Sequence, residues 1–374
     1  MKEKYSLLRK LSNVRIKPDV TVLQGFFLDH FVTYLGDEGS LDSYISRLRE
    51  LAELGGGNIP ESRQQILRGG KGFNTSSALA SLGAHVHYLG RTDEFGLHLM
   101  KFFAKGKDID FTHVKTDGEL AITVALELKH MGRPFNAMFN HPGSVADFSF
   151  EDLESSDLEL IRRTDYLIVT EWTMNLKGTD LAEKIFSYSE GFPCRKFFDP
   201  GDPTWRKQDI NDLVERVLLP AKFQVLSVNE SEAVWYASYF DHRYLDRMGI
   251  EPLEKLGLEC ARRLRDELKL RIDLHTPSFT ASFEGDKEVL IPTFEVEVRR
   301  VTGAGDAWQA GDVYGELIGL TPEERLLLAN ATAAYYISHP RGDHGDLKEV
   351  REFIAVNRLK EPPNYIKPRG GVSS

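Results

Sequence analysis

The chain has few cysteines, the residues that form the disulfides of small secreted domains and the thiolate ligands of metal sites. Only Cys194 and Cys260 are cysteines among its 374 residues. This count excludes a disulfide framework and a cysteine-rich metal site, and it favours a reducing compartment. The chain also lacks an apolar run long enough to span a membrane, and its charged N-terminus lacks the apolar core of a signal peptide. We therefore expect a cytoplasmic protein with no membrane partner.

The chain has fewer basic residues than acidic ones. The 47 lysines and arginines are outnumbered by 57 aspartates and glutamates, so the formal net charge is −10. This balance argues against a broad nucleic-acid-binding surface, although a local basic pocket for a phosphate remains compatible with it. With 41% hydrophobic and 28% charged residues, the composition is that of a globular protein. The length suits one large α/β domain or two smaller ones.

Short apolar segments alternate with helical patterns along most of the chain. This alternation predicts an α/β fold, a mostly parallel central sheet with helices on both faces and an active site at the carboxyl ends of the strands. We expect strands at 20–28, 85–90, 164–172, 196–200 and 223–229, and helices at 73–82, 148–163 and 230–239. Another helix should begin at the capping box of Thr321 and Glu324, with Pro322 at its first position.

Two segments interrupt the alternation. Residues 41–54 have helical periodicity after Ser40, a suitable cap, and predict an inserted helix. Residues 120–144 contain two strand patterns around Gly132 and predict a hairpin, which could form a small β lid over the sheet edge. The segments 30–66 and 118–145 are therefore the expected lid, and 361–374 the expected irregular tail.

The sequence "RRVTGAGDAWQAG" places two glycines and a carboxylate before an amphipathic helical pattern. Gly303 and Gly305 suit a tight turn, and a turn that leads into a helix N-terminus exposes backbone N–H groups to an anion. A carboxylate at such a position, Asp306, suits a base that removes a proton from a hydroxyl group attacking a phosphoryl group. The alternative is an ordinary turn in which Asp306 only complements the helix dipole.

Two further motifs carry polar groups at expected turns. In "GGKGFN", Gly69, Gly70 and Gly72 allow close approach of the backbone to a polar ligand, while Lys71 and Asn74 offer donors. Because no Lys-Ser/Thr pair follows at the required spacing, this is not a P-loop. A plain glycine-rich connection is the alternative.

The third motif, "NESE", follows an expected strand. Asn229 and Glu232 could hold the waters around Mg²⁺. They could equally form a helix cap.

Together, and in this order, the motifs resemble the PfkB family of ribokinase-like carbohydrate kinases. "GGKGFN" and "VTGAGDAWQAG" resemble the two family signatures, and "NESE" resembles its Asn-x-x-Glu motif. "GFFLDHF" is similar to the first strand, which carries a sugar-binding aspartate, and "LANATAAYYIS" to the late helix beside the nucleotide. The resemblance spans about residues 20–354. It implies one ribokinase-like α/β domain over residues 1–374.

The resemblance implies ATP- and Mg²⁺-dependent phosphorylation of a primary hydroxyl group of a small sugar or sugar acid. Asp306 would be the general base, and the backbone of Gly303, Ala304 and Gly305 the anion hole. The residues implied to bind ligands are Asp29, Gly69, Gly70, Lys71 and Asn74 for the sugar, Asn229, Thr302, His275 and Asn330 for the nucleotide, and Asn229 and Glu232 for Mg²⁺, through water. The lid would exclude water so that ATP is not hydrolysed.

Two alternatives remain open from the residues. A nucleoside kinase shares this scaffold, and a sugar- or nucleotide-binding regulator could have lost turnover. Relatives with lid sheets often pair as dimers, which leaves a homodimer open.

The chain departs from the family pattern at two motifs and at the inserted helix. Relatives often carry Asp-Thr-Thr, whose Asp helps bind potassium, where this chain has Arg300, Val301 and Thr302. We hypothesise that the charge of Arg300 replaces the monovalent cation; the alternative is an arginine that faces solvent. Where relatives have Thr-x-Gly-x-x-Gly near the phosphates, this chain has His275 and Pro277. Proline lacks an N–H donor, so the identity of the phosphate donor stays open.

Overall fold

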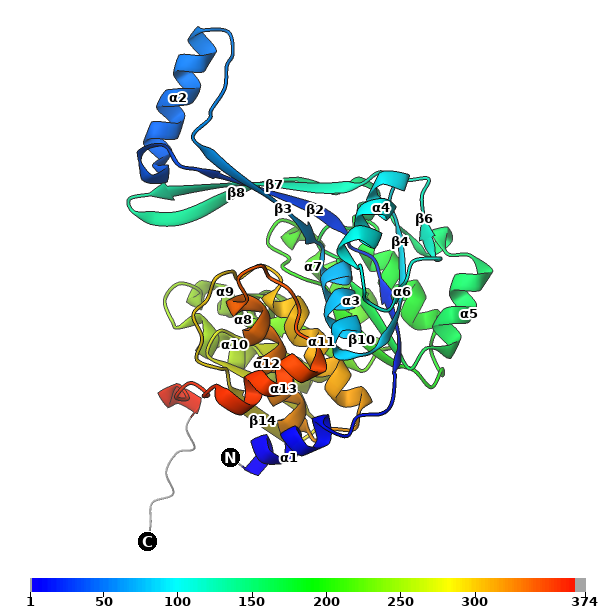
Figure 1. Ribbon diagram of the computed structural model, residues 1–374. Coiled ribbons are helices and arrows are strands. Elements are labelled where there is room, and N and C mark those ends of the chain that lie inside the picture. The colour runs from blue at the N-terminus through cyan, green and yellow to red at the C-terminus, as the bar shows by residue number, and fades with distance from the viewer. Residues whose placement is uncertain (1, 367–374) are drawn as a thin grey trace.

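A ten-stranded sheet forms the centre of the computed structural model, which describes residues 2–366 (Figure 1). Its main path runs β14-β13-β12-β11-β10-β9-β1-β4-β5, and β6 pairs with β4. The strands are β1 (Asp19–Leu23), β4 (His85–Arg91), β5 (Ile109–Asp110), β6 (Val114–Lys115), β9 (Tyr166–Thr170), β10 (Arg195–Asp199), β11 (Val225–Asn229), β12 (Arg271–His275), β13 (Phe279–Glu284) and β14 (Lys287–Pro292). Pairing is parallel from β5 to β12 and antiparallel from β12 to β14, which confirms the mostly parallel sheet.

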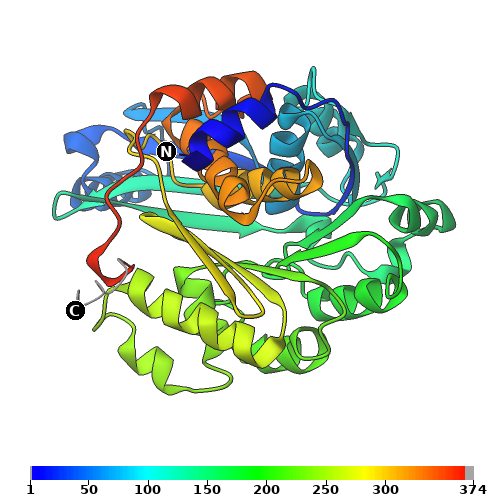
Figure 2. The ribbon, with the colours of Figure 1, turned by 90° about the horizontal axis from the view of Figure 1, so that it is seen from below.

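Helices cover both faces of this sheet, as predicted (Figure 2). The helices are α1 (Lys2–Leu11), α2 (Leu41–Glu53), α3 (Lys71–Leu82), α4 (Glu94–Phe103), α5 (Ser155–Arg163), α6 (Gly178–Tyr188), α7 (Ile210–Leu213), α8 (Glu230–Ala237), α9 (Arg243–Arg247), α10 (Leu253–Leu268), α11 (Ala304–Leu317), α12 (Pro322–Ser338) and α13 (Leu347–Val356). One core packs α5, α6, α8 and α10 against the sheet, and a second packs α1, α3, α11, α12 and α13 against the other face. Strands buried on both faces explain the continuous apolar runs in the sequence.

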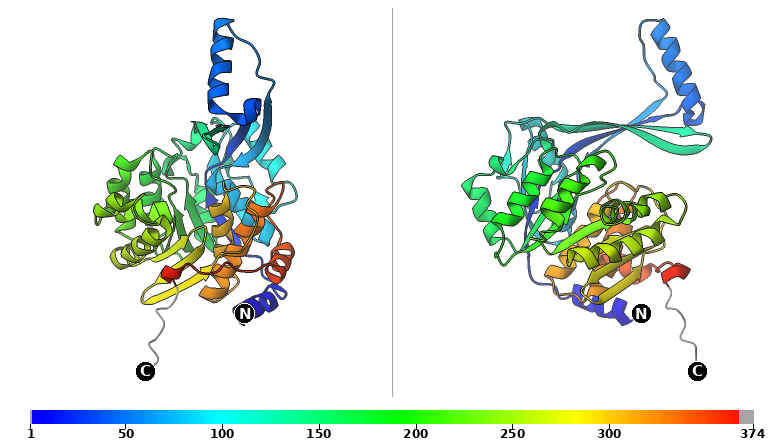
Figure 3. Two further views of the ribbon diagram at one scale, coloured as in Figure 1. Left: turned by 90° about the vertical axis from the view of Figure 1, so that its left-hand side faces the viewer. Right: turned by 180° about the vertical axis from the view of Figure 1, so that it is seen from behind.

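A second, four-stranded sheet extends from the core as a lid (Figures 1 and 3). Its order is β3 (Ser62–Gly69), β2 (Phe27–Tyr34), β7 (Ala121–His130) and β8 (Arg133–His141). The strands β2 and β7 pair in parallel, whereas the other neighbours are antiparallel. The predicted hairpin is confirmed as β7 and β8, and its turn has positive φ angles at Met131 and Gly132.

The expected continuous strand at 20–28 is wrong. The chain leaves the central sheet after Leu23 and enters the lid at Phe27. Gln24 and Gly25 have φ angles of 42° and 96°, which break extended geometry and redirect the chain. The change of sheet therefore occurs within one apolar run, where hydrophobicity carries no boundary signal.

The inserted helix is confirmed as α2, which stands at the far end of the lid (Figures 1 and 3). The Ser40 hydroxyl accepts a hydrogen bond from the Ser43 amide at 3.4 Å, as expected of a cap. None of the residues of α2 is buried. The helix therefore adds surface rather than core.

The remaining differences lie at helix boundaries and at the ends of the chain. The helix expected at 148–163 begins only at Ser155, after a 3₁₀ turn at Phe150–Asp152. The helix α1 was not expected, because charge dominates its sequence, but its Leu7 and Leu11 are buried. In the expected tail, Asn364–Ile366 form a 3₁₀ turn, and residues 367–374 lie outside the described part. Among the described residues, no helix has the length and apolarity needed to cross a membrane.

Candidate active site

The Gly-Ala-Gly-Asp segment forms a turn at the N-terminus of α11. Gly303 caps the helix with a φ angle of 82°, and a Cβ atom there would lie 2.7 Å from the Tyr336 hydroxyl oxygen. Glycine is therefore required for both conformation and space. The Tyr336 hydroxyl donates to the Thr302 carbonyl at 3.1 Å and holds the turn. The first turn of α11 presents its N–H groups here, although that of Ala304 donates to the Val301 carbonyl at 3.1 Å.

Asp306 lies in the first turn of α11, with only 6% of its surface exposed. Its Oδ2 accepts a hydrogen bond of 3.0 Å from Asn74 Nδ2, and its Oδ1 lies 3.8 Å from Lys71 Nζ. Burial raises the pKa of Asp306, while the Lys71 charge and the Asn74 hydrogen bond oppose the rise. The structure thus brings the two glycine motifs together around one buried carboxylate.

Two acidic residues that we did not select complete the surroundings of Lys71. Lys71 Nζ donates to Asp199 Oδ2 at 2.8 Å, and the Lys71 backbone N–H donates to Glu171 Oε2 at the same distance. Asp199 is the last residue of β10, and Glu171 directly follows β9. The carboxyl ends of parallel strands are the expected location of a site, so their position after predicted strands could have revealed both residues.

The lid contributes Asp29 from β2. A Cβ atom at Gly69 would lie 2.2 Å from Asp29 Oδ2, so the glycine makes room for this carboxylate. Gly70 has a φ angle of 86°, and a Cβ atom there would lie 2.2 Å from the Gly25 carbonyl oxygen. Burial raises the pKa of Asp29 to about 7. A hydrogen bond from Thr123 acts to lower this pKa, whereas the negative charge of Asp306 acts to raise it. The lid and the core therefore meet at this site.

Burial also raises the pKa of two other carboxyl groups near Lys71. The pKa of Glu171 rises to about 7, and that of Glu232 to about 8, in both cases chiefly because burial disfavours the charged form. The positive charge of Lys71 opposes both rises. Such a group of perturbed carboxyls marks a candidate catalytic site.

Asn229 and Glu232 form a capping box at the start of α8. Asn229 Oδ1 accepts the N–H groups of Ser231 and Glu232, both at 2.9 Å, and Glu232 Oε2 accepts the Asn229 N–H at 2.8 Å. The structure therefore confirms that Asn229 and Glu232 cap the helix. These bonds use one of the two Glu232 carboxylate oxygens, so the cap is compatible with a Mg²⁺ ion held through water.

A cavity of about 450 Å³ borders the Gly303–Gly305 turn. Its lining includes Asn229, His275, Pro277, Ala304, Gly305, Trp308 and Asn330. The rings of His275 and Trp308 lie 5.2 Å apart, and burial lowers the pKa of His275 to about 4, so this imidazole is neutral at pH 7. Most residues that we expected to contact the nucleotide therefore line one space. Thr302 is the exception, since it is exposed and lies outside this lining.

The side-chain oxygen and nitrogen of Asn330 already form hydrogen bonds within the protein. Its Oδ1 accepts from Trp308 Nε1 at 2.9 Å and from the Thr280 hydroxyl at 3.0 Å, and its Nδ2 donates to the Pro292 carbonyl at 3.1 Å. Pro277 lies in the short turn between β12 and β13. Asn330 thus shapes the cavity wall, while a direct bond to a nucleotide would require these bonds to break.

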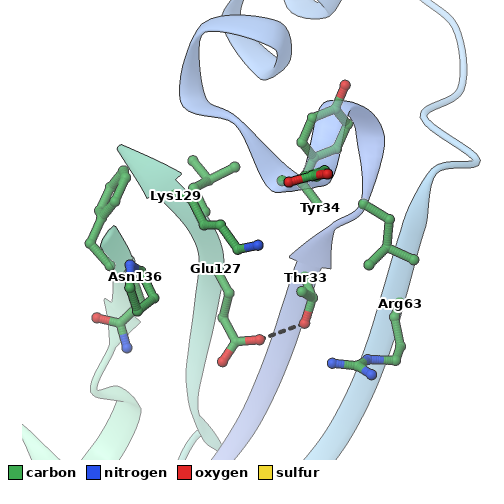
Figure 4. A pocket seen from close by; sticks show the side chains of 12 residues that line it. Thr33, Tyr34, Arg63, Glu127, Lys129 and Asn136 are labelled. Atoms are coloured by element: carbon green, nitrogen blue, oxygen red, sulfur yellow. Dashed lines mark hydrogen bonds between the residues drawn. The ribbon is translucent and has the colours of Figure 1, made fainter. Parts of the chain in front are cut away.

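A larger cavity, of about 700 Å³, lies in the lid at the base of α2 (Figure 4). Figure 4 shows side chains from β2, β3, β7 and β8 around it, with the Thr33 hydroxyl donating to Glu127 Oε2 at 2.5 Å. None of the residues that surround Asp306 lines this cavity. We therefore place the candidate active site at the smaller cavity and the adjoining lid, and not at this larger cavity.

Arg300 does not simply face solvent. Its Nη2 donates to the carbonyls of His339 and Pro340 at 3.3 and 2.9 Å, and its guanidinium lies 5.9 Å from the centre of the Tyr336 ring. A Cβ atom at Gly342 would lie 2.1 Å from Arg300 Nη1, so the glycine makes room for the arginine. A fixed positive charge thus binds backbone carbonyls close to the Gly303–Gly305 turn.

Comparison with protein families now identifies the chain. The model of the pfkB family of carbohydrate kinases matches residues 40–248, more than half of the sequence. The chain belongs to the PfkB family. It is therefore a sugar or nucleoside kinase. The match includes the GGKGFN and NESE motifs but ends before Asp306, whose placement rests on the structure.

Relatives in this family share about a quarter of their residues with the chain. An uncharacterized sugar kinase of Archaeoglobus fulgidus is 26% identical over 259 residues, which cover 68% of this chain and 92% of the relative. A 5-dehydro-2-deoxygluconokinase of Geobacillus thermodenitrificans is 23% identical over 311 residues, which cover 79% of this chain and 86% of the relative.

Solved structures confirm the ribokinase-like fold. A ribokinase of Arabidopsis thaliana, solved with ribose and ATP, superposes with a TM-score of 0.66 at 18% identity and covers 91% of this chain and 99% of its own. A putative ribokinase II of E. coli, solved with ATP and Mg²⁺, gives a TM-score of 0.68 at 11% identity and covers 90% and 99%.

Proposed function

We propose that the protein transfers the γ-phosphoryl group of ATP to a primary hydroxyl group of a small sugar or sugar acid. The observation that carries this proposal is the position of the Asp306 carboxylate. It is bonded to Asn74 and lies close to Lys71, in the first turn of a helix that borders a cavity of nucleotide size. The names of two similar proteins, a 5-dehydro-2-deoxygluconokinase and a ribokinase solved with ribose and ATP, agree with a small polar acceptor.

Asp306 acts as the general base. Its raised pKa makes the carboxylate a better proton acceptor, and the nearby Lys71 charge favours its ionised form. The acceptor hydroxyl lies between Asp29 of the lid and Asp306, and gives its proton to Asp306 as its oxygen attacks the phosphorus atom. The backbone N–H groups of Gly303 and Gly305 stabilise the negative charge on the transferred group, whereas that of Ala304 donates to the Val301 carbonyl.

Mg²⁺ suits the acidic side of the site. The available ligands there are the oxygens of Glu232 and its neighbours Asp199 and Asp202, whose charges contribute to the raised pKa of Glu232. A cation would relieve this repulsion, and all-oxygen surroundings match the preference of Mg²⁺ for carboxylates and water. Glu232 and Asn229 would hold the ion through water, and it would neutralise phosphate charge during transfer.

The test measures Mg²⁺-dependent ADP formation from ATP across a panel of sugars, sugar acids and nucleosides. We expect turnover with one sugar or sugar acid, and a loss of about 10²- to 10⁴-fold in kcat for Asp306→Asn. Asp42→Asn, at an exposed position on α2, is the matched control and should retain full activity.

Three results would contradict the proposal. Turnover with nucleosides alone would show the nucleoside kinase instead. Equal rates for Asp306→Asn and the unmodified protein would show that Asp306 is not the general base. Ligand-induced thermal stabilisation without turnover, with either ATP or ADP as donor, would show a binding protein.

A further inference from the structure

A second cluster of ionisable side chains lies at the end of the central sheet opposite the active site. Asp19 begins β1 and His85 begins β4, and these two residues are directly paired in the sheet. His87 lies two positions further along β4, so its side chain emerges on the same face as that of His85. One ligand atom from each of the three residues lies within 4.8 Å of the others.

Carboxylates contact both histidine rings, and two of these carboxylates lie outside this group of three. His87 Nε2 lies 3.2 Å from Asp19 Oδ2, and its Nδ1 lies 3.2 Å from Oδ2 of Asp110, its partner on β5. His85 Nδ1 lies 2.9 Å from Asp108 Oδ1. Histidines that bind metal ions usually donate their second ring N–H to a carboxylate, as His87 Nδ1 is placed to do toward Asp110, and this fixes the orientation and the tautomer of the ring.

The geometry and the charges of the cluster favour a bound cation. The rings of His85 and His87 lie 4.5 Å apart, so both imidazoles can serve one ion. Within residues 2–366, the three carboxylates of Asp19, Asp108 and Asp110 face one ammonium group, that of Lys17 on Asp108. These carboxylates and this ammonium group together carry two negative charges, which one divalent cation balances.

The solvent access of the site and the chemistry of its ligand atoms indicate which type of ion it would bind. The side chains of Asp19 and His85 are 40% and 31% exposed, whereas that of His87 is only 14% exposed, so an ion can enter from solvent and reach a fixed ring. Two imidazole nitrogens and one carboxylate oxygen suit Zn²⁺ or a similar transition-metal ion with a water in the remaining position. Mg²⁺ prefers oxygen ligands alone.

We propose that Asp19, His85 and His87 form a binding site for a divalent transition-metal ion, best matched by Zn²⁺, that joins β1 to β4. The site is distinct from the catalytic one. The length of β1, roughly 13 Å, separates Asp19 from the start of the turn at Gln24 and Gly25 that leads to the catalytic residues. The ion therefore stabilises the sheet and takes no part in phosphoryl transfer.

The experiment uses the full chain without a histidine tag and stripped of metal. Zn²⁺ affinity is measured by competition with a chromophoric chelator, Co²⁺ binding by its visible absorption, and stability by thermal unfolding with Zn²⁺ or Mg²⁺. We expect one Zn²⁺ per chain, a Co²⁺ spectrum of a nitrogen- and oxygen-ligated ion, and a rise in Tm with Zn²⁺ that Mg²⁺ does not reproduce.

Variants locate the ion. Asp19→Asn should weaken Zn²⁺ binding by at least about tenfold, and Asp110→Asn by about 10- to 100-fold through loss of the support for His87. His98→Gln, at an exposed histidine outside the cluster, should bind Zn²⁺ as the unmodified protein does. Both aspartate variants should retain kinase activity, which also shows that they are folded.

Either of two results would overturn the inference. One is the absence of saturable Zn²⁺ binding by the unmodified protein. The other is unchanged affinity in both Asp19→Asn and Asp110→Asn, which would place the ion elsewhere, for example among the catalytic carboxylates.

Discussion

Asn74 and Asp306 are joined by a hydrogen bond of 3.0 Å between side chains that are 232 positions apart in the sequence. The bond connects α3, which follows the lid strand β3, with α11, which follows the Gly303 turn. Both side chains are buried, so the bond is made away from competing water. It fixes the orientation of the carboxylate that we propose as the base.

Replacing Asn74 with leucine should therefore change the titration of Asp306 as well as the rate. Leucine has a similar shape but no donor. The lost hydrogen bond to a charged group should lower kcat/KM by about tenfold or more. It should also raise the pKa of Asp306 further, so the acidic limb of the pH–rate profile should move to higher pH. An unshifted profile would contradict this role, and Asn211→Leu, at an exposed position, serves as the control.

The ion pair of Lys71 and Asp199 should stabilise the fold as a unit. Asp199 has a side chain only 2% exposed, and Lys71 Nζ lies 2.8 Å from it. Lys71→Met leaves this buried carboxylate unpaired and should cost about 3 kcal/mol in the free energy of unfolding. The double variant with Asp199→Asn should recover part of this loss. Urea unfolding of the unmodified protein, the two single variants and the double variant measures the coupling. Strictly additive losses of unfolding free energy would show that the pair does not act together.

Glu171 should make stability depend on pH near neutrality. Its pKa is about 7 in the folded protein and near 4.5 in a free side chain, so the folded state binds a proton between these values. The resulting stabilisation is complete below pH 4.5 and is lost as the pH rises through about 7. Glu171→Gln keeps an acceptor for the Lys71 N–H and cannot ionise. Relative to the unmodified protein, the variant should therefore gain up to about 3 kcal/mol between pH 5 and pH 8. A stability difference that is constant across this range would contradict the prediction.

Arg300 should make the enzyme independent of potassium. Its guanidinium binds the carbonyls of His339 and Pro340 and thus supplies a fixed positive charge near the Gly303–Gly305 turn. We expect equal rates in sodium, potassium and a bulky organic cation. Arg300→Ala should be slower and should regain activity with potassium. Strong potassium activation of the unmodified protein would show that the arginine does not replace the cation.

Much of the fold and the centre of the site could be predicted from local sequence. The α/β alternation, the hairpin, the inserted helix and the Thr321 cap depend on periodicity and on contacts between near neighbours. The turn before Asp306 was also visible, because glycines that precede a helix combine backbone freedom with free N–H groups. The general-base role of Asp306 and the roles of the other site residues remain predictions until variants are measured.

The tertiary structure decided what depends on strand order and on changes of direction. The break at Gln24 and Gly25 carries no hydrophobic signal, so the lid strand β2 was merged with β1. Glu171 and Asp199 enter the site because neighbouring parallel strands end at one edge. Asp19 meets His85 only through the pairing of β1 with β4. Sequence records the interactions of each residue with its neighbours along the chain, whereas these contacts depend on which distant strands pair and in which register, and that choice is made by the packing of the whole sheet.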